Sequence, residues 1–277
     1  MARRDIHRGI LNQTARTPDR YRWLAAAVIE VPARALATVM PYERAYDRAS
    51  FVFYLAAITG MLWGLFAYLR RWFDEEPALI AALVAACTIR ITMRQHDYAP
   101  YSYLEPIFVS LALLAILDRR LVSLAALIAV ATFNRETAIF LVLLYVVTSD
   151  FSPRAWRWTA FYTGIWAACY GIVRIVGGDA DRYWTLERVW RTNMSQPSLA
   201  LVNVTLLLGA FWMFAALGLR HAPPFVRRTA LVVPAYLGTI ALWGIWWEVR
   251  LLMPLYPVLF GLALSYLYEP RPVAATA

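Results

Sequence analysis

Residues 121–148 decide the fold, and they read LVSLAALIAVATFNRETAIFLVLLYVVT. Apolar side chains fill both arms of this stretch, and Asn134-Arg135-Glu136 interrupts it at the centre. At ~1.5 Å per residue, each arm forms a helix of about 20 Å, which is shorter than the ~30 Å hydrocarbon core of a bilayer. The stretch therefore predicts a short helical hairpin in a membrane, with its polar turn below the surface or in a water-filled cavity.

The composition of the whole chain also favours a membrane location. The chain has 277 residues, of which 61% are hydrophobic and 16% are charged. Soluble domains have roughly 45–50% apolar and about 25% charged residues. A soluble globule would have to hide too much apolar surface, and a disordered chain needs low hydrophobicity. The composition predicts an all-α protein, a polytopic transmembrane helical bundle.

Apolar segments elsewhere predict about seven full spans. We expect helices because the bilayer core offers no water to backbone groups. The expected spans are residues 51–69, 77–91, 104–117, 159–176, 199–219, 229–247 and 251–268. With the hairpin they form a membrane domain over residues 51–268, between a polar N-terminal segment (1–50) and a short tail (269–277).

The N-terminal segment allows two interpretations. Residues 23–40 are moderately apolar but contain Glu30 and Arg34, which form an i,i+4 pair on one helical face. The segment is either a first transmembrane helix or an amphipathic helix on the outer face. No signal peptide is expected, since the apolar region is weak and starts late.

Arginines near the span ends predict the orientation. The net charge is +9, and all 27 basic residues are arginine. Basic residues concentrate in cytoplasmic loops. Arginines flank the spans at 70–71, 119–120, 154–157, 227–228 and 271. Between any two of these arginine sites the chain crosses the membrane an even number of times. All of them can therefore lie on the cytoplasmic side. We expect a plasma (inner) membrane protein with a cytoplasmic C-terminus and no nucleic-acid partner.

This orientation brings the polar and aromatic clusters together on the outer face. They occupy residues 42–48, 95–103, 134–136, 177–198 and 246–250. Part of the fourth cluster, residues 181–193, is expected to form an interfacial helix. Placing an ionisable residue inside the membrane costs free energy, so such residues are usually paired, hydrated or part of a functional site. The convergence predicts a shared outer site.

Three polar clusters supply candidate groups for this site. Arg135 would bind a phosphate, Asn134 would also contact the substrate, and Glu136 would orient the phosphate or act as a base. Alternatively, Arg135 and Glu136 are a self-neutralising pair that shapes the hairpin turn. His96 beside Asp97 offers acid–base chemistry. The remaining candidates are Tyr101, for sugar hydroxyls, and Glu248 with Arg250, for a polar headgroup or sugar. Alternatively, His96 and Asp97 lie in an ordinary solvated loop. Residues 246–250 would then form an aromatic belt at the membrane interface with a surface ion pair.

Three stretches resemble the GT-C superfamily of multi-pass glycosyltransferases, which use polyprenyl-phosphate-linked sugars. They are YRWL at 21–24, the 121–145 stretch with NRET at 134–137, and EVRLLMPLYP at 248–257. The similarity extends over most of residues 20–268. It implies a GT-C-like bundle, an outer active site, an acidic base in the first outer loop, and a lipid-phosphate sugar donor reached from the membrane lipid.

The chain departs from the GT-C pattern at its N-terminus. Such enzymes usually begin with a transmembrane helix and a large outer loop that carries the acid, whereas no strong apolar helix precedes residue 20 here. The chain is therefore expected to be a shortened or degenerate member. The expected catalytic carboxylates are Asp5, Asp47, Asp97 and Glu136.

The alternative to an enzyme is a non-catalytic, GT-C-derived accessory subunit of a larger membrane complex. Its tryptophans and tyrosines would then contact other membrane subunits. A transporter is a weaker candidate, because the sequence shows one interrupted helix and no repeat. No cluster of His and Cys has metal-ligand spacing.

Overall fold

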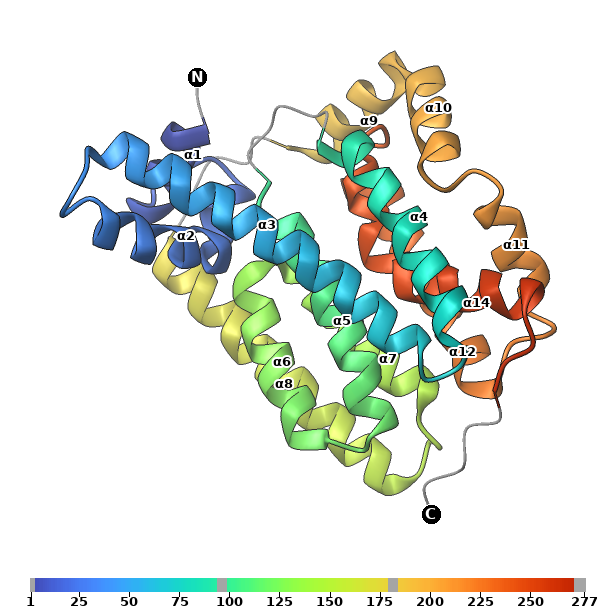
Figure 1. Ribbon diagram of the computed structural model, residues 1–277. Coiled ribbons are helices and arrows are strands. Elements are labelled where there is room, and N and C mark those ends of the chain that lie inside the picture. Colours follow the sequence, from blue (N-terminus) through green and yellow to red (C-terminus); the bar gives the residue numbers. More distant parts are fainter. Residues whose placement is uncertain (1–2, 94–98, 179–183, 272–277) are drawn as a thin grey trace.

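The computed structural model describes residues 3–93, 99–178 and 184–271, and over these residues it is all-helical, with 81% helix and no strands (Figure 1). Four helical segments are long and apolar enough to cross a membrane. They are α3 (Tyr42–Leu69), α8 (Pro153–Gly177), α12 (Pro224–Thr229) continuing into α13 (Val232–Trp243), and η3 (Val249–Leu255) continuing into α14 (Tyr256–Leu267). The predicted all-helical class is confirmed, and these helices indicate a membrane protein.

The other predicted spans correspond to shorter or more charged helices. Residues 77–91 lie in α4 (Glu75–Met93), which carries charged residues in its first and last turns, and residues 104–117 lie in α5 (Tyr101–Leu117). Neither is among the four segments above. Among the described residues, four segments qualify by length and composition, or five if the bent pair described below is one span, and the number of seven stays a prediction.

The central stretch forms the predicted hairpin. Helix α6 (Leu121–Asn134) is followed by the 3-10 turn η2 (Glu136–Ala138) and by α7 (Ile139–Thr148). The Tyr162 hydroxyl of α8 donates to the carbonyl of Leu121 at 3.0 Å, and its ring packs edge-on against Tyr145. The start of α6 and the end of α7 therefore lie at the same end of the bundle.

The expected single span 199–219 is broken. It consists of α10 (Pro197–Leu208) and α11 (Phe211–Gly218), whose axes differ by 68°. Gly209 ends α10 with a positive φ of 51°, a conformation that glycine adopts without steric cost. The expectation of only one interrupted helix is therefore wrong. The preceding helix α9 (Leu186–Ser195) covers much of the predicted interfacial segment and exposes Trp190.

The N-terminal segment folds as short helices. They are α1 (Arg3–Leu11), η1 (Asp19–Tyr21) and α2 (Trp23–Leu36). At 14 residues, α2 is about 21 Å long, which is too short to cross a bilayer. It packs against α3, which starts at Tyr42 rather than at residue 51. The predicted Glu30–Arg34 pair is present at 2.7 Å.

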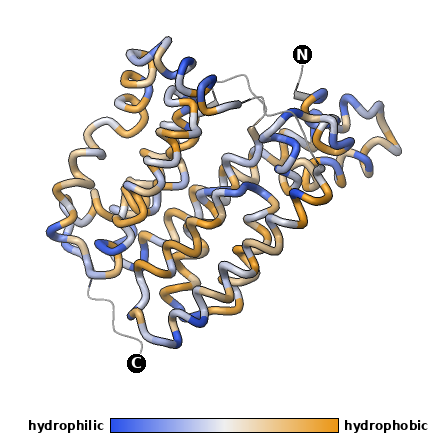
Figure 2. The backbone as a smooth tube through the Cα atoms, turned by 180° about the vertical axis from the view of Figure 1, so that it is seen from behind, coloured by the Kyte–Doolittle hydropathy of each residue, from blue (hydrophilic) through white to orange (hydrophobic). Residues whose placement is uncertain are grey.

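The apolar core runs along the middle of the helices, and the polar residues concentrate towards their ends (Figure 2). At one end, Arg71 pairs with Asp118 and Arg271 pairs with Asp74. Arg228 donates there to the Ser149 carbonyl at 3.1 Å. Several of the arginine-marked helix ends therefore lie together, as the sequence predicted, and their cytoplasmic location stays a prediction.

Candidate functional site

Two adjoining cavities of about 840 and 680 Å³ lie at the other end of the bundle. They share wall residues on both sides of η1, in the α6–α7 turn, before α9, at the end of α13 and in η3. We therefore treat them as the larger and smaller lobes of one chamber. The shared wall consists of Thr17, Pro18, Arg22, Arg135, Trp184, Trp243, Gly244 and Leu251. Segments far apart in the sequence thus enclose one polar space.

Arg135 stands where the hairpin turns. Because α6 ends at Asn134 and Arg135 is extended (φ −166°, ψ 146°), its guanidinium reaches α5, where Nη1 donates to Glu105 Oε2 at 2.7 Å. Thr137 donates to the other oxygen of Glu105 at 2.5 Å. The Asn134 amide donates to the Tyr101 carbonyl at 3.0 Å. The polar turn is therefore fixed to the start of α5.

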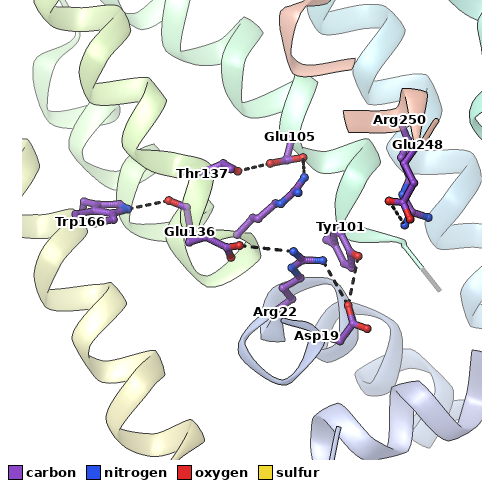
Figure 3. A network of polar contacts seen from close by, with 10 residues as sticks. Asp19, Arg22, Tyr101, Glu105, Glu136, Thr137, Trp166, Glu248 and Arg250 are labelled. Atoms are coloured by element: carbon purple, nitrogen blue, oxygen red, sulfur yellow. Dashed lines mark hydrogen bonds and ion pairs between the residues drawn. The ribbon is translucent and has the colours of Figure 1, made fainter. Parts of the chain in front are cut away.

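Arg22 enters the same space from the junction of η1 and α2 (Figure 3). Its guanidinium lies over the Tyr101 ring, with the central carbon 4.2 Å from the ring centroid. It is 3.4 Å from Asp19 Oδ1 and 3.6 Å from Glu136 Oε1. Both distances exceed the 2.7–2.9 Å usual for charge-assisted hydrogen bonds. Arg22 is thus a buried cation with loosely held counter-ions.

The third arginine, Arg250, lies in η3 beside Glu248 (Figure 3). Arg250 Nη2 donates to Glu248 Oε2 at 2.8 Å, and both side chains are largely buried. The larger lobe also contains Arg174 of α8, whose guanidinium lies 4.0 Å from the centroid of the Tyr21 ring. The smaller lobe is thus bordered by Arg22, Arg135 and Arg250 together.

Asp19 is the carboxylate best placed for proton transfer. It lines the smaller lobe and accepts a hydrogen bond from the Tyr101 hydroxyl at 3.3 Å. Burial raises the pKa of Asp19, against the opposing effects of Arg22 and the Tyr101 hydrogen bond. A carboxylate with a raised pKa is a better proton acceptor at neutral pH than an ordinary aspartate.

The structure brings five of the ten candidate site residues together. Asp5, Tyr101, Arg135, Glu248 and Arg250 line the smaller lobe. Their chemical roles stay predictions.

The remaining candidates lie in other surroundings. Glu136 lines the larger lobe, and Asn134 is fully buried behind the wall. Asp47 does not line either lobe, since it is exposed on α3 and pairs with Arg4 at 2.5 Å. His96 and Asp97 lie outside the described residues.

Sequence reasoning missed Asp19 and Arg22 as site residues, as well as Glu105 as the partner of Arg135. The signal for the first two is the charged run from Asp19 to Arg22, which stands directly before the first apolar segment. The signal for Glu105 is an acid near the start of an apolar span, where an ionised side chain needs a partner.

Comparisons with protein-family profiles, with curated proteins and with solved structures found no match to this chain. Within residues 3–93, 99–178 and 184–271, no group of three or more His, Cys, Asp or Glu side chains is arranged to bind a metal ion.

Proposed function

We propose that this chain is a membrane glycosyltransferase of the GT-C kind, which moves a sugar from a lipid-phosphate donor to a hydroxyl acceptor in the chamber. The observation that carries the proposal is the meeting of Arg22, Arg135 and Arg250, from distant parts of the sequence, around one cavity. Cationic groups fixed beside a developing charge lower the barrier to its formation. A departing phosphate is such a charge.

Arg22 is the first candidate to bind the phosphate. Its side chain is only 6% exposed, and its contacts with Asp19 and Glu136 are long. Among the described residues, its Nε atom has no hydrogen-bond partner. A planar guanidinium binds phosphate oxygens through two parallel hydrogen bonds. An incoming phosphate would supply the acceptors that this side chain lacks.

Asp19 takes the role of general base in this scheme. Its carboxylate accepts the proton of the acceptor hydroxyl, whose oxygen forms a bond to the anomeric carbon of the sugar. The bond from that carbon to the phosphate oxygen breaks, and the lipid phosphate leaves with its electron pair beside Arg22. The raised pKa of Asp19 and its position in the smaller lobe support this assignment.

The surroundings of the chamber suit a donor with a lipid tail. The larger lobe includes Tyr170 of α8 and Ile240 of α13, which belong to two of the candidate membrane spans. The apolar pocket beside Arg135 and Glu105 has a volume of only about 30 Å³, so it does not hold a lipid tail. In this proposal the headgroup lies in the chamber and the tail lies along the lipid-facing surface of these spans.

A non-catalytic subunit is the second candidate. Two of the three arginines already have carboxylate partners at normal distances, Arg135 with Glu105 at 2.7 Å and Arg250 with Glu248 at 2.8 Å. If Arg135–Glu105 only joins the hairpin to α5 and Arg250–Glu248 only neutralises η3, the chamber needs no phosphate. The two candidates differ in whether the chamber binds a lipid phosphate.

The first test measures binding of polyprenyl phosphate without a sugar, using the fluorescence of the native tryptophans. Trp184 and Trp243 line both lobes, so a bound ligand is expected to change their emission. The expected result is saturable binding that weakens at least about tenfold in Arg22→Gln, since a charge-assisted pair contributes roughly 1.5–3 kcal/mol. Arg191→Gln on exposed α9 is the matched control, with the same loss of charge.

The second test measures sugar transfer in proteoliposomes with polyprenyl-phosphate-linked hexose. Asp19→Asn is expected to lower turnover by roughly 10²-fold or more, the usual contribution of a general base, while polyprenyl phosphate still binds. Near-wild-type transfer in Arg22→Gln, Arg135→Gln and Arg250→Gln would contradict the enzymatic assignment. Absence of polyprenyl phosphate binding to the wild type would favour the accessory subunit.

A further inference from the structure

Arg174 stands at the chamber end of α8, where aromatic rings cover its guanidinium. The central carbon of the guanidinium lies 4.0 Å from the centroid of the Tyr21 ring and 4.9 Å from that of the Tyr170 ring. Tyr170 in turn stacks on Trp166, with 5.2 Å between the centroids and an interplanar angle of 9°. Trp166, Tyr170 and Arg174 follow one another at intervals of four residues, so they share one face of α8. Planar side chains thus form a continuous row at this end of the helix.

Hydrogen bonds hold both ends of this row. The indole Nε1 of Trp166 donates to the carbonyl of Glu136 at 3.1 Å (Figure 3). The Tyr21 hydroxyl donates to the carbonyl of Gly178 at 3.0 Å. Because the rings are fixed, the guanidinium between them has few orientations, and it loses less conformational entropy when its N–H groups bind an acceptor. Arg174 is therefore preorganised to bind an anion.

Arg174 differs from the other chamber arginines in its counter-ions. Arg22, Arg135 and Arg250 each lie beside a carboxylate. Within residues 3–93, 99–178 and 184–271, no carboxylate forms an ion pair with Arg174. Glu136, the acid that lines the same lobe, lies 3.6 Å from Arg22 instead. The rings contact the faces of the Arg174 guanidinium, and its N–H groups lie in the guanidinium plane, where they can donate to oxygens of a bound ligand.

The side chains around Arg174 face lipid. Helix α8 is one of the candidate spans, and only 17% of its apolar window is buried in the protein. Ile172, Ile175 and Val176 are exposed apolar neighbours of Arg174, and Ile175 is 82% exposed. In a bilayer these side chains contact acyl chains, and a cation at the end of a span lies at the level of the lipid headgroups. The anionic group that is abundant at this level is a lipid phosphate.

Arg174 also marks the side of the larger lobe. Helix α8 packs against α6 and α7, and α13 packs against α7 and α9. The larger lobe takes one wall from α8, with Arg174, and another from α13, with Thr239, Ile240 and Trp243. Both helices belong to candidate spans, and Trp243 is 63% exposed. The larger lobe therefore reaches the lipid-facing surface between these two spans.

We propose that Arg174 binds the phosphate of an anionic phospholipid from the surrounding bilayer. The phosphate lies at the side of the larger lobe, and the acyl chains lie along Ile172 and Val176. A zwitterionic phospholipid offers the same phosphate, but its ammonium group cancels the charge that attracts the arginine. This inference does not rest on the proposed sugar transfer, because it leaves Arg22 to the polyprenyl phosphate and assigns Arg174 to a bilayer lipid.

Competition between two phospholipids tests the proposal. The protein is placed in nanodiscs that contain equal amounts of phosphatidylglycerol and phosphatidylcholine with identical acyl chains, and native mass spectrometry counts the lipids that stay bound after release. A basic side chain at an anionic membrane surface gives a preference of roughly fivefold. The wild type is expected to prefer phosphatidylglycerol by this factor, and Arg174→Gln is expected to lose that preference. A preference that persists in full in Arg174→Gln would overturn the proposal.

Two further variants separate a built site from general charge. Arg191→Gln removes the same charge from α9, where Arg191 is already paired with Glu187 at 2.6 Å, and is expected to keep the wild-type preference. Tyr170→Leu removes one of the two rings on the guanidinium and is expected to lower the preference at least about twofold. A loss in Arg191→Gln as large as that in Arg174→Gln, or full preference in Tyr170→Leu, would overturn the site.

Binding of polyprenyl phosphate to the same variants identifies which lipid Arg174 contacts. Arg22→Gln is expected to weaken polyprenyl phosphate and to keep the preference for phosphatidylglycerol. The opposite pattern, in which Arg174→Gln loses polyprenyl phosphate but keeps that preference, would overturn the proposal by assigning Arg174 to the sugar donor. If the wild type binds no polyprenyl phosphate, the proposed function fails, and the comparison of the two phospholipids still decides the role of Arg174.

Discussion

The chamber and the contact between α11 and α14 bury their residues in opposite ways. At the chamber wall, Arg135 and Glu105 are buried side chains of opposite charge that form an ion pair at 2.7 Å. At the α11–α14 contact, the backbones come so close that a Cβ added at Gly218 would lie 1.9 Å from the Leu262 carbonyl oxygen. Charge balance therefore fixes one region and shape fixes the other. The two regions should respond differently to the same kind of substitution.

The largest effect is expected from Glu105→Ala. It leaves the Arg135 guanidinium buried without its counter-ion, which typically costs about 3–5 kcal/mol. The free energy of unfolding in a mild detergent should fall by that amount. The double variant Glu105→Leu with Arg135→Leu should recover most of the loss, because it removes the charges together. An equal loss in the single and double variants would show that shape, rather than charge balance, matters here.

Gly218→Ala tests the close contact between α11 and α14. The added methyl group forces α11 away from the backbone of α14, and overpacking of this kind costs typically 1–3 kcal/mol. Thermal unfolding should report the loss. Gly238→Ala in α13 is the matched control, since a Cβ there meets nothing within 4 Å. The control should be neutral or slightly stabilising, as alanine is favoured in helices.

Asp19→Asn tests the state of the Asp19 carboxylate in the chamber through the pH dependence of the folding stability. Because the pKa of Asp19 is raised in the folded state, its ionisation works against folding. The stability of the wild type should fall as the pH rises above about 4, the ordinary pKa of an aspartate, and the variant should lack this component. The difference at pH 7 should be smaller than the effect of Gly218→Ala. A variant less stable than the wild type at pH 7 would show that Asp19 is instead a structural counter-ion of Arg22.

The smallest effect is expected from Glu187→Ala. Its partner Arg191 is an i,i+4 neighbour on α9, and the two side chains are 79% and 80% exposed. Exposed helical pairs contribute about 0.3–0.5 kcal/mol, so the melting temperature should barely change. A loss close to that of Glu105→Ala would mean that burial does not decide the strength of ion pairs in this protein.

The sequence was sufficient to predict the helical class, the central hairpin and the meeting of Arg135 with Arg250. These features depend on local signals, namely apolar runs, the polar interruption at Asn134 and arginines near the helix ends. The break at Gly209 was missed because glycine is common within membrane helices, and only its positive φ marks the end of α10.

The roles of Asp19 and Arg22 could not be predicted in the same way. Both stand before the first apolar segment, in a run that looks like an ordinary solvated terminus. Their burial depends on η1 lying between the start of α5, where Arg22 packs on the Tyr101 ring, and the end of α8, where Arg174 packs on the Tyr21 ring. Such contacts join residues distant in sequence, so the charged run from Asp19 to Arg22 marks this segment but does not show which chamber it lines.

The pair between Glu105 and Arg135 also bears on how the chain is assembled in the membrane. Glu105 precedes Arg135 by 30 residues, and each ionised side chain needs the other as its counter-ion. An unpaired carboxylate is costly at membrane depth, and so is an unpaired guanidinium. We therefore expect α5 and the hairpin to reach their final places together rather than one after the other.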